Sequence, residues 1–391
     1  MNCPPLALLV VGLLGACTFE PVYLDFEVAL TELDEVAGLL ATPEGFVVAG
    51  VHGTADDGGQ AQVALYSETG EAEGHFRFDR EAPSHARMQG AVTLPGGDVL
   101  LLGYSNGVQG WRLGADRALR WQGPLGGGTF QRAVAVDAVG RVAVVGQSQA
   151  DGTYLLWAAV FEVGAEALTL RGESTWRAPE GSAEGLAVTS TVDGFLVGGG
   201  FVAGTGERPV LLALDAEGTL TPTNLHPAAS ASGRVGALVA VAGGRVIVVG
   251  DTGTRASVGV FDPKGQVPWA PVSFCISRAA FNRPVTAAAI GGHVWVAGYA
   301  TYDARTLWLA EVDPANGPLQ ARTFGPQPAG GAERASMTVG GAGGLALAAT
   351  LCGRQREGRC ASDAVGENAP HLWHLDPSAL QYGEPAETTC R

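Results

Sequence analysis

Three short motifs in this chain match sequences that carry chemistry in other proteins. Residues 103–107, GYSNG, match the pattern GxSxG, in which the serine, here Ser105, is a nucleophile on a strand-to-helix turn. Residues 251–253, Asp-Thr-Gly, resemble the aspartic-protease motif, whose chemistry needs two aspartates that share one proton. His371 and His374 are close enough in sequence to suggest a pair of metal ligands.

The surroundings of each motif favour a structural role. The residues after Ser105, beginning VQGWRL, have the pattern of a strand and not of the helix that a serine nucleophile needs. No second Asp-Thr-Gly accompanies Asp251. His371 and His374 are three residues apart, so on a strand they point to opposite faces and cannot share one ion. We therefore expect no catalytic residue, no metal site and no cofactor.

These motifs lie inside a repeat. An apolar stretch, ending in glycine in all but one copy, recurs seven times at intervals of about 50 residues, which is typical of repeat architectures. Six copies end at a glycine and the seventh, GLALAAT, ends at Thr350. The glycines are Gly50, Gly103, Gly146, Gly199, Gly250 and Gly298. The repeat thus accounts for Gly103, and it places Asp251 directly after a repeat glycine.

Each repeat predicts four antiparallel strands. A turn with Gly-Gly, Asp-Gly or Pro-Gly precedes the glycine-ended strand, so the first two strands form a hairpin. A third strand ends in phrases such as LLALDAEG, where Asp215 can bond its own backbone two residues on, and a more variable fourth strand follows. The sequence predicts an all-β fold, a seven-bladed β-propeller of four-stranded blades. We expect residues 22–30, VYLDFEVAL, to complete the last blade as its outer strand and close the ring.

Tryptophans lie in several of the predicted strands: Trp111, Trp157, Trp295, Trp308 and Trp373. We expect them to pack between blades, and a platform for stacking sugars is the alternative. The repeats resemble the delta-60 type of large bacterial secreted proteins, in which a GG-apolar-G phrase precedes a Leu-Asp-x-x-Gly phrase. That resemblance covers nearly the whole chain after the N-terminal segment and implies a propeller, with no chemistry to transfer.

The N-terminal segment predicts export and lipidation. Residues 4–16, PPLALLVVGLLGA, fit the apolar region of a signal peptide and are short for a transmembrane helix. Leu14-Gly15-Ala16-Cys17 resembles a bacterial lipobox, which implies cleavage after residue 16 and a lipid on Cys17. A signal peptide without lipid and a buried apolar start are the alternatives, since no Lys or Arg precedes the apolar run. The expected division is 1–16 as signal peptide and 18–391 as one propeller domain.

An anchored protein of the bacterial cell envelope follows from this prediction. Multiple acyl chains on one cysteine give stable anchoring. The residue after Cys17 is Thr18, whereas an aspartate at this position would favour retention in the inner membrane. The outer membrane is therefore the expected location, and which of its two faces carries the protein is left open. The formal net charge of −15 and the absence of a Lys/Arg cluster disfavour nucleic acid as a partner. We expect a monomer.

Four further cysteines suggest two disulfides in an exported protein. Cys352 and Cys360 bound one short polar loop and are the first choice for a pair, whereas Cys275 and Cys390 pair with each other or stay free. The loop between Cys352 and Cys360 carries three arginines in an acidic protein, which could bind an acidic partner or a carboxylate. The alternative is a solvated loop stapled for stability. The arginines are Arg354, Arg356 and Arg359.

Three functions remain open on this sequence. The leading hypothesis is a non-catalytic, lipid-anchored propeller that binds a protein or glycan at the cell envelope. The second is a propeller enzyme, a lyase or glycosidase, with its site at the mouth of the central channel. The strands expected to line that channel are rich in Ala, Val and Gly, which counts against this enzyme. The third is a scaffold in outer-membrane protein assembly.

Overall fold

The computed structural model describes most of the chain from residue 24 to residue 375. The described ranges are 24–30, 33, 35–52, 60–78, 87–104, 107–165, 167–223, 232–263, 271–275, 281–290, 292–301, 305–314, 317–324, 332–339, 344–351, 355–356, 359–360 and 369–375. Within them the only helix is a single 3₁₀ turn, Ala242–Gly244. No helix in these ranges has the length and apolar character that crossing a membrane requires.

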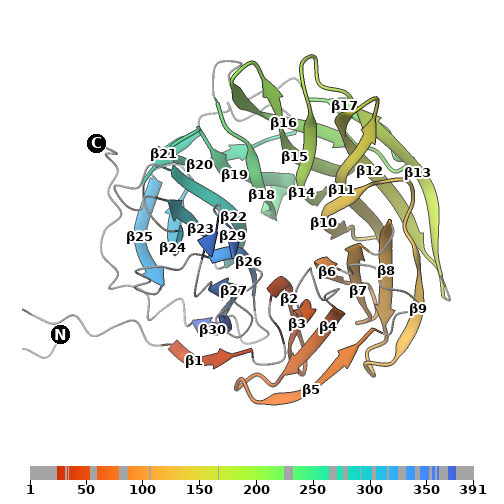
Figure 1. Ribbon diagram of the computed structural model, residues 1–391, viewed down its shortest axis with the longest axis vertical. Helices are drawn as coiled ribbons and strands as arrows, with labels where there is room; N and C mark the ends of the chain where they lie inside the picture. Colours follow the sequence, from red (N-terminus) through yellow and green to blue (C-terminus); the bar gives the residue numbers. More distant parts are fainter. Residues whose placement is uncertain are drawn as a thin grey trace, which may run out of the picture.

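The strands form seven four-stranded antiparallel sheets around a central channel, which confirms the predicted seven-bladed β-propeller (Figure 1). The first sheet contains β2 (Glu35–Thr42), β3 (Gly45–His52), β4 (Gln60–Tyr66) and β5 (Ala72–Arg77). The second contains β6 (Arg87–Thr93), β7 (Val99–Tyr104), β8 (Val108–Leu113) and β9 (Leu119–Pro124). The third contains β10 (Phe130–Val136), β11 (Arg141–Ala150), β12 (Thr153–Val163) and β13 (Leu168–Trp176).

The next three sheets repeat this order from the channel outward. The fourth contains β14 (Ala183–Thr191), β15 (Gly194–Ala203), β16 (Gly206–Leu214) and β17 (Leu220–Pro222). The fifth contains β18 (Val235–Val241), β19 (Arg245–Asp251), β20 (Ala256–Phe261) and β21 (Val272–Phe274). The sixth contains β22 (Phe281–Ile290), β23 (His293–Thr301), β24 (Arg305–Asp313) and β25 (Gly317–Phe324).

The seventh sheet contains strands from both ends of the described chain. Its order is β26 (Ala332–Val339), β27 (Leu345–Leu351), β30 (Ala369–Leu375) and β1 (Leu24–Ala29), with β26 next to the channel. β1 pairs antiparallel with β30, and Leu24 lies opposite Leu375. Because a strand from the N-terminal end supplies the outer edge of this sheet, the first and last parts of the chain are tied together by backbone hydrogen bonds.

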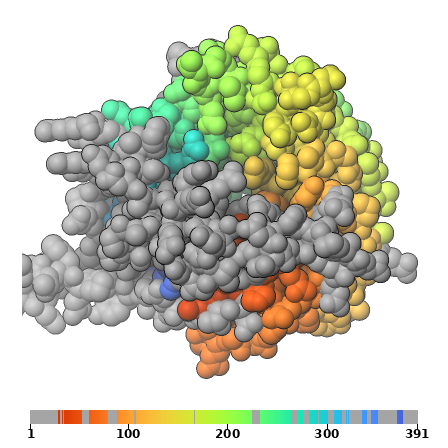
Figure 2. All heavy atoms as spheres, in the orientation of Figure 1, coloured from red at the N-terminus to blue at the C-terminus, as the bar shows by residue number. Residues whose placement is uncertain are grey.

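Apolar cores lie between neighbouring sheets. One cluster joins Trp295 of the sixth sheet to Leu347 and Trp373 of the seventh, and another joins Val249 of the fifth to Trp308 of the sixth. All five tryptophans named in the sequence are 0–3% exposed, which confirms that they pack between sheets. Figure 2 shows the described side chains of the second to fourth sheets (orange to green) as one continuous surface around the disc.

The repeat glycine has a steric cause. Gly250 on β19 pairs with Val235 on β18, and a Cβ on Gly250 would lie 2.3 Å from the carbonyl oxygen of Arg234. Equivalent positions at Gly146 and Gly199 would bring a Cβ to 1.9 and 2.0 Å from a carbonyl oxygen of the innermost strand. A side chain there would therefore collide with backbone, so the recurring glycine is required by the close approach of two strands.

The predicted turn aspartates also behave as expected where they are described. Asp215 Oδ1 accepts hydrogen bonds from the backbone N–H groups of Glu217 and Thr219, at 3.0 and 2.7 Å. The carboxylate thus satisfies backbone donors in the turn after β16. This supports turn chemistry at Asp215 instead of a role as a metal ligand.

Candidate functional site at the channel mouth

A β-bulge interrupts every innermost strand beside the repeat position. In six of the seven, one residue is skipped in the pairing with the neighbouring strand. A bulge re-aims the side chain of the skipped residue. The skipped residues are Ala37, Gln89, Arg132, Leu186, Gly236 and Val285, and all six line a cavity of about 200 Å³ in the channel.

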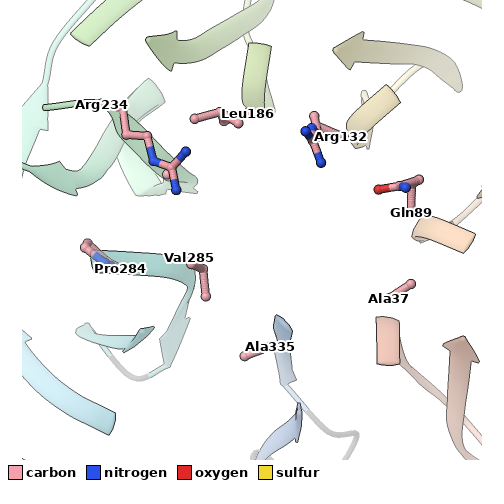
Figure 3. A pocket seen from close by; sticks show the side chains of 9 residues that line it. Ala37, Gln89, Arg132, Leu186, Arg234, Pro284, Val285 and Ala335 are labelled. Atoms are coloured by element: carbon pink, nitrogen blue, oxygen red, sulfur yellow. The ribbon is translucent and has the colours of Figure 1, made fainter. Parts of the chain in front are cut away.

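The cavity has a polar side and an apolar side. Figure 3 shows the guanidinium groups of Arg132 and Arg234 directed into the channel, with Leu186 between them and Gln89 beside Arg132. The remaining lining residues are small or apolar: Ala37, Gly236, Pro284, Val285 and Ala335. The expectation of a channel lined by Ala, Val and Gly is thus right for one side and wrong for the other.

Charged side chains of alternating sign surround this opening. Arg132 Nη2 lies 3.6 Å from Glu184 Oε2, and Arg234 Nη1 lies 3.5 Å from Glu184 Oε1, so one carboxylate faces both arginines. Arg283 Nη2 lies 3.3 Å from Glu207 Oε2. Glu184 lies at the beginning of β14, Glu207 at the beginning of β16 and Arg283 near the beginning of β22. Arg234 directly precedes β18, and Arg132 lies on β10. Sheets three to six therefore all contribute to the cluster.

Asp251 is the most buried member of this cluster. It is 4% exposed, and its Oδ2 lies 3.6 Å from Arg283 Nε and 4.0 Å from Arg234 Nε. Its Oδ1 accepts a hydrogen bond from the N–H of Gly253, at 3.2 Å. Burial raises the pKa of Asp251, although Arg283, the Gly253 N–H and Arg234 oppose the rise.

The two ends of the cluster differ in exposure. Burial lowers the pKa of Arg234, helped by the charge of Arg283 and opposed by Glu184, Glu207 and Asp251. The Arg234 side chain is 20% exposed, whereas the Arg132 side chain is 38% exposed. The cluster therefore runs from a buried pairing at Asp251 to an accessible guanidinium at Arg132.

A second hollow, of about 160 Å³, adjoins the cluster between the third and fourth sheets. Tyr154 and Phe201 supply aromatic rings, and Tyr154 is 37% exposed. Polar groups around them come from Gln147, Ser182, Glu184, Glu207 and Arg234. Because Arg234 lines both hollows and Glu184 contacts both arginines, the two hollows form one composite site.

Most site residues named from the sequence lie outside this region. Cys17, Ser105, Cys352 and Arg354 are outside the described residues, so their roles stay predictions. Cys275 is buried and disulfide-bonded, but the side chains of the other three predicted partners are not described and the pairing stays a prediction.

The arginine loop is described only in its backbone. Arg356 pairs with Arg359 in a two-stranded hairpin of β28 (Gln355–Arg356) and β29 (Arg359–Cys360), which lies against β26. The described residues hold no group of three His, Cys, Asp or Glu side chains that could bind a metal. His371 stacks on Trp373, with ring centroids 5.3 Å apart, and His374 contacts Phe46.

Sequence reasoning dismissed Asp251 as a lone protease motif and did not name Arg132, Arg234, Arg283, Glu184 or Glu207. In the structure Asp251 belongs to the ion-pair cluster. A signal was present at the position two residues before the bulge, where five of the seven repeats carry a charged residue: Glu35, Arg87, Glu184, Arg234 and Arg283. Recognising it required knowing that those positions meet at one rim.

Comparisons with known proteins support the fold. No protein-family model and no curated protein matches the sequence. Among solved structures, the polysaccharide lyase Uly1 superposes with a TM-score of 0.57 and 8% identity, over 91% of this chain and 100% of that one. An inactive virginiamycin B lyase from Staphylococcus aureus, with quinupristin, gives 0.55 and 11%, over 89% and 98%. Sqt1 from Chaetomium thermophilum gives 0.54 and 12%, over 89% and 96%.

These similarities define the class as a β-propeller. Sequence identities of 8–12% indicate a shared fold but not a shared function, because β-propellers host unrelated activities. The lipobox and the resemblance to delta-60-type repeats remain predictions from the sequence.

Proposed function

We propose that this protein is a non-catalytic, lipid-anchored β-propeller of the bacterial cell envelope that binds a glycan at the channel mouth. The hollow beside Tyr154 carries the proposal. A sugar ring presents apolar C–H faces and polar hydroxyl edges, and this hollow offers an exposed aromatic ring beside amide, hydroxyl, carboxylate and guanidinium groups. Ser182 Oγ accepts a hydrogen bond from the N–H of Tyr154, at 3.3 Å, which ties β14 to the β11–β12 hairpin that carries the ring.

The ion pairs of the rim favour binding over catalysis. Each carboxylate of the cluster faces at least one arginine. Asp251 has the raised pKa expected of a general acid, but its Oδ2 is buried and cannot reach a ligand. A fixed set of paired charges suits recognition of hydroxyl groups.

Binding can be tested by calorimetry against a panel of cell-envelope oligosaccharides. Tyr154→Ala is expected to weaken binding about tenfold or more, because Tyr154 carries the more exposed of the two aromatic rings of the hollow. Phe76→Ala is the matched control, since Phe76 is also 37% exposed but lies on β5, the outer strand of the first sheet. Equal losses in both variants, or no glycan bound by the wild-type protein, would overturn the proposal; capture of a protein partner alone would point to the protein-binding alternative.

The enzyme alternative has one observation in its favour. Asp251, Glu184 and Glu207 converge at one channel mouth, as a glycosidase or lyase would require. Incubating the bound oligosaccharide with the protein and separating the products by chromatography distinguishes the two functions. Fragments that disappear in Glu207→Gln would establish the enzyme, whereas an intact ligand supports the binder.

The lipid anchor has its own test. Cys17→Ala is expected to move the protein from the detergent phase to the aqueous phase after detergent partitioning of cell envelopes, because no acyl chain is attached. An unchanged partition would mean that Cys17 does not carry the anchor. Fractionation of the two membranes then tests the outer-membrane location, and assembly defects in a deletion strain test the scaffold alternative.

A further inference from the structure

Two arginines, Arg132 and Arg234, line the cavity in the channel. We propose that it binds a carboxylate group, held by Arg132 and Arg234. The inference rests on the proposed glycan function and narrows it: the carboxylate belongs to an acidic sugar residue of that glycan, or to a free organic acid that offers the same group.

The charge of the cavity points to an anion. Its described lining residues include two guanidinium groups and one amide, those of Arg132, Arg234 and Gln89, but no carboxylate. The lining thus presents positive groups in a chain of net charge −15, although the carboxylates of the surrounding cluster, Glu184, Glu207 and Asp251, pair with arginines of that cluster. Guanidinium groups bind carboxylates through paired, parallel hydrogen bonds.

Glu184 holds both arginines at the cavity. It faces Arg132 at 3.6 Å and Arg234 at 3.5 Å, both longer than the roughly 2.7–2.9 Å of a tight charge-assisted hydrogen bond. One carboxylate placed between the two arginines thus helps to orient both toward the cavity. Arg132 is carried into the channel by the bulge between Gln131 and Ala133, which fixes its direction.

The rest of the cavity selects for a compact ligand. Its volume of about 200 Å³ lies below the range of roughly 300–1,000 Å³ usual for sites of drug-sized molecules. Leu186 lies between the two arginines, and Val285 and Ala335 give an apolar wall across the cavity from them. One sugar-acid residue fits this combination, with its carboxylate toward the arginines and its C–H face toward the apolar wall. The neighbouring sugar would then reach the hollow beside Tyr154, because Arg234 borders both.

The test compares two ligands that differ only in the carboxylate. Calorimetry measures the affinity of an oligosaccharide that ends in a hexuronic acid and of its counterpart that ends in the neutral hexose; free hexuronic acid forms a third arm. We expect the wild-type protein to bind the acidic oligosaccharide about tenfold or more tightly than the neutral one.

Two variants and one matched control assign the preference to the cavity. Arg132→Gln is expected to reduce the acidic-to-neutral affinity ratio to near unity, and Arg132→Lys to restore it only in part, because lysine keeps the charge but not the paired hydrogen bonds. Arg171→Gln should leave the ratio unchanged: Arg171 is 41% exposed and faces Glu162 at 3.3 Å, much like Arg132 and Glu184, but lies on the outer strand β13. Circular dichroism checks that each variant folds.

The outcomes separate this inference from the glycan function. Equal affinity for both oligosaccharides overturns the carboxylate site while glycan binding stands. Binding of the free acid alone, lost in Arg132→Gln, supports the site, identifies a free organic acid as its ligand and overturns the glycan function. A preference that Arg171→Gln removes as fully as Arg132→Gln would reflect overall charge and would overturn the site.

Discussion

Two regions of the ring use the same repeat position in opposite ways. At the fourth-to-sixth sheets the position is glycine, the strands approach closely, and charged residues gather at the rim. At the seam between the seventh sheet and the first, the position is Thr350, which is 1% exposed and accepts a hydrogen bond from the N–H of Val36 on β2, at 2.8 Å. The same repeat position therefore lets two strands approach closely where it is glycine, and it hydrogen-bonds the last sheet to the first where it is threonine.

The pairing beside the bulge differs between the two places. In β18 the bulge leaves Gly250 directly opposite Val235, and no side chain fits between the strands. In β26 the two residues between Ala332 and Ala335 lie opposite the single Thr350, so no residue of β26 is paired directly with Thr350. A side chain is accommodated at this position, and its hydroxyl reaches β2. The pairing at the bulge therefore decides which residue is tolerated at the repeat position.

The largest expected effect comes from placing a side chain at the repeat glycine opposite a bulge. Gly250→Ala would bring a Cβ to 2.3 Å from the carbonyl oxygen of Arg234. Backbone cannot rotate away as a side chain can, so we expect a loss of about 3 kcal/mol in the free energy of unfolding. Urea-induced unfolding followed by tryptophan fluorescence measures it.

Gly90→Ala is the control for that experiment. Gly90 also lies on an innermost strand, β6, but a Cβ there meets only the Val134 side chain, at the ordinary contact distance of 3.6 Å. Its cost should stay below about 1 kcal/mol. Equal costs at Gly90 and Gly250 would show that the loss reflects glycine in strands generally and not the close backbone approach at Gly250.

The seam is tested by removing one hydroxyl. Thr350→Val keeps the shape of the side chain but leaves the N–H of Val36 without its acceptor in a buried place. We expect a loss of about 1–3 kcal/mol in the free energy of unfolding, with partial recovery in Thr350→Ser. Thr189→Val is the matched control, because Thr189 on β14 is 9% exposed and its hydroxyl makes no hydrogen bond to other described residues.

The seam and the rim also differ in how far the sequence predicted them. The apolar–glycine repeat predicted seven four-stranded sheets, because period and turn residues are local properties of the chain. It could not predict which residues face the channel: a bulge shifts the alternation by one residue, and Arg132 reaches the cavity only for that reason. Nor could spacing show that Asp251, Arg234 and Arg283 meet, since this depends on how successive sheets are placed around the ring.

The rim gives the third prediction, through the pH dependence of stability. Burial raises the pKa of Asp251 above its ordinary value of 3.8, so the folded protein favours the protonated form and loses stability as the pH rises through the raised value. Asp251→Asn removes this loss while Oδ1 can still accept from Gly253. Arg234 and Arg283 keep Glu184 and Glu207 as partners.

The variant should accordingly be more stable than the wild-type protein at pH 7, by up to about 1 kcal/mol, with the advantage vanishing toward pH 3.8. Urea unfolding at a series of pH values measures both proteins. A variant that is less stable at pH 7, with a deficit that closes on acidification, would show that the ionised carboxylate stabilises the rim.

The smallest effect belongs to the second hydroxyl at the seam. Ser336 Oγ on β26 accepts a hydrogen bond from the N–H of Leu39 on β2, at 3.1 Å, but this contact is only partly buried. In Ser336→Ala water can replace the lost acceptor, so the free energy of unfolding should fall by about 0.5 kcal/mol, clearly less than in Thr350→Val. If the two hydroxyls act on one seam, the double variant should lose more or less than the sum of the two single losses. Strict additivity would mean that each hydroxyl stabilises its own strand locally and that the seam does not act as a unit.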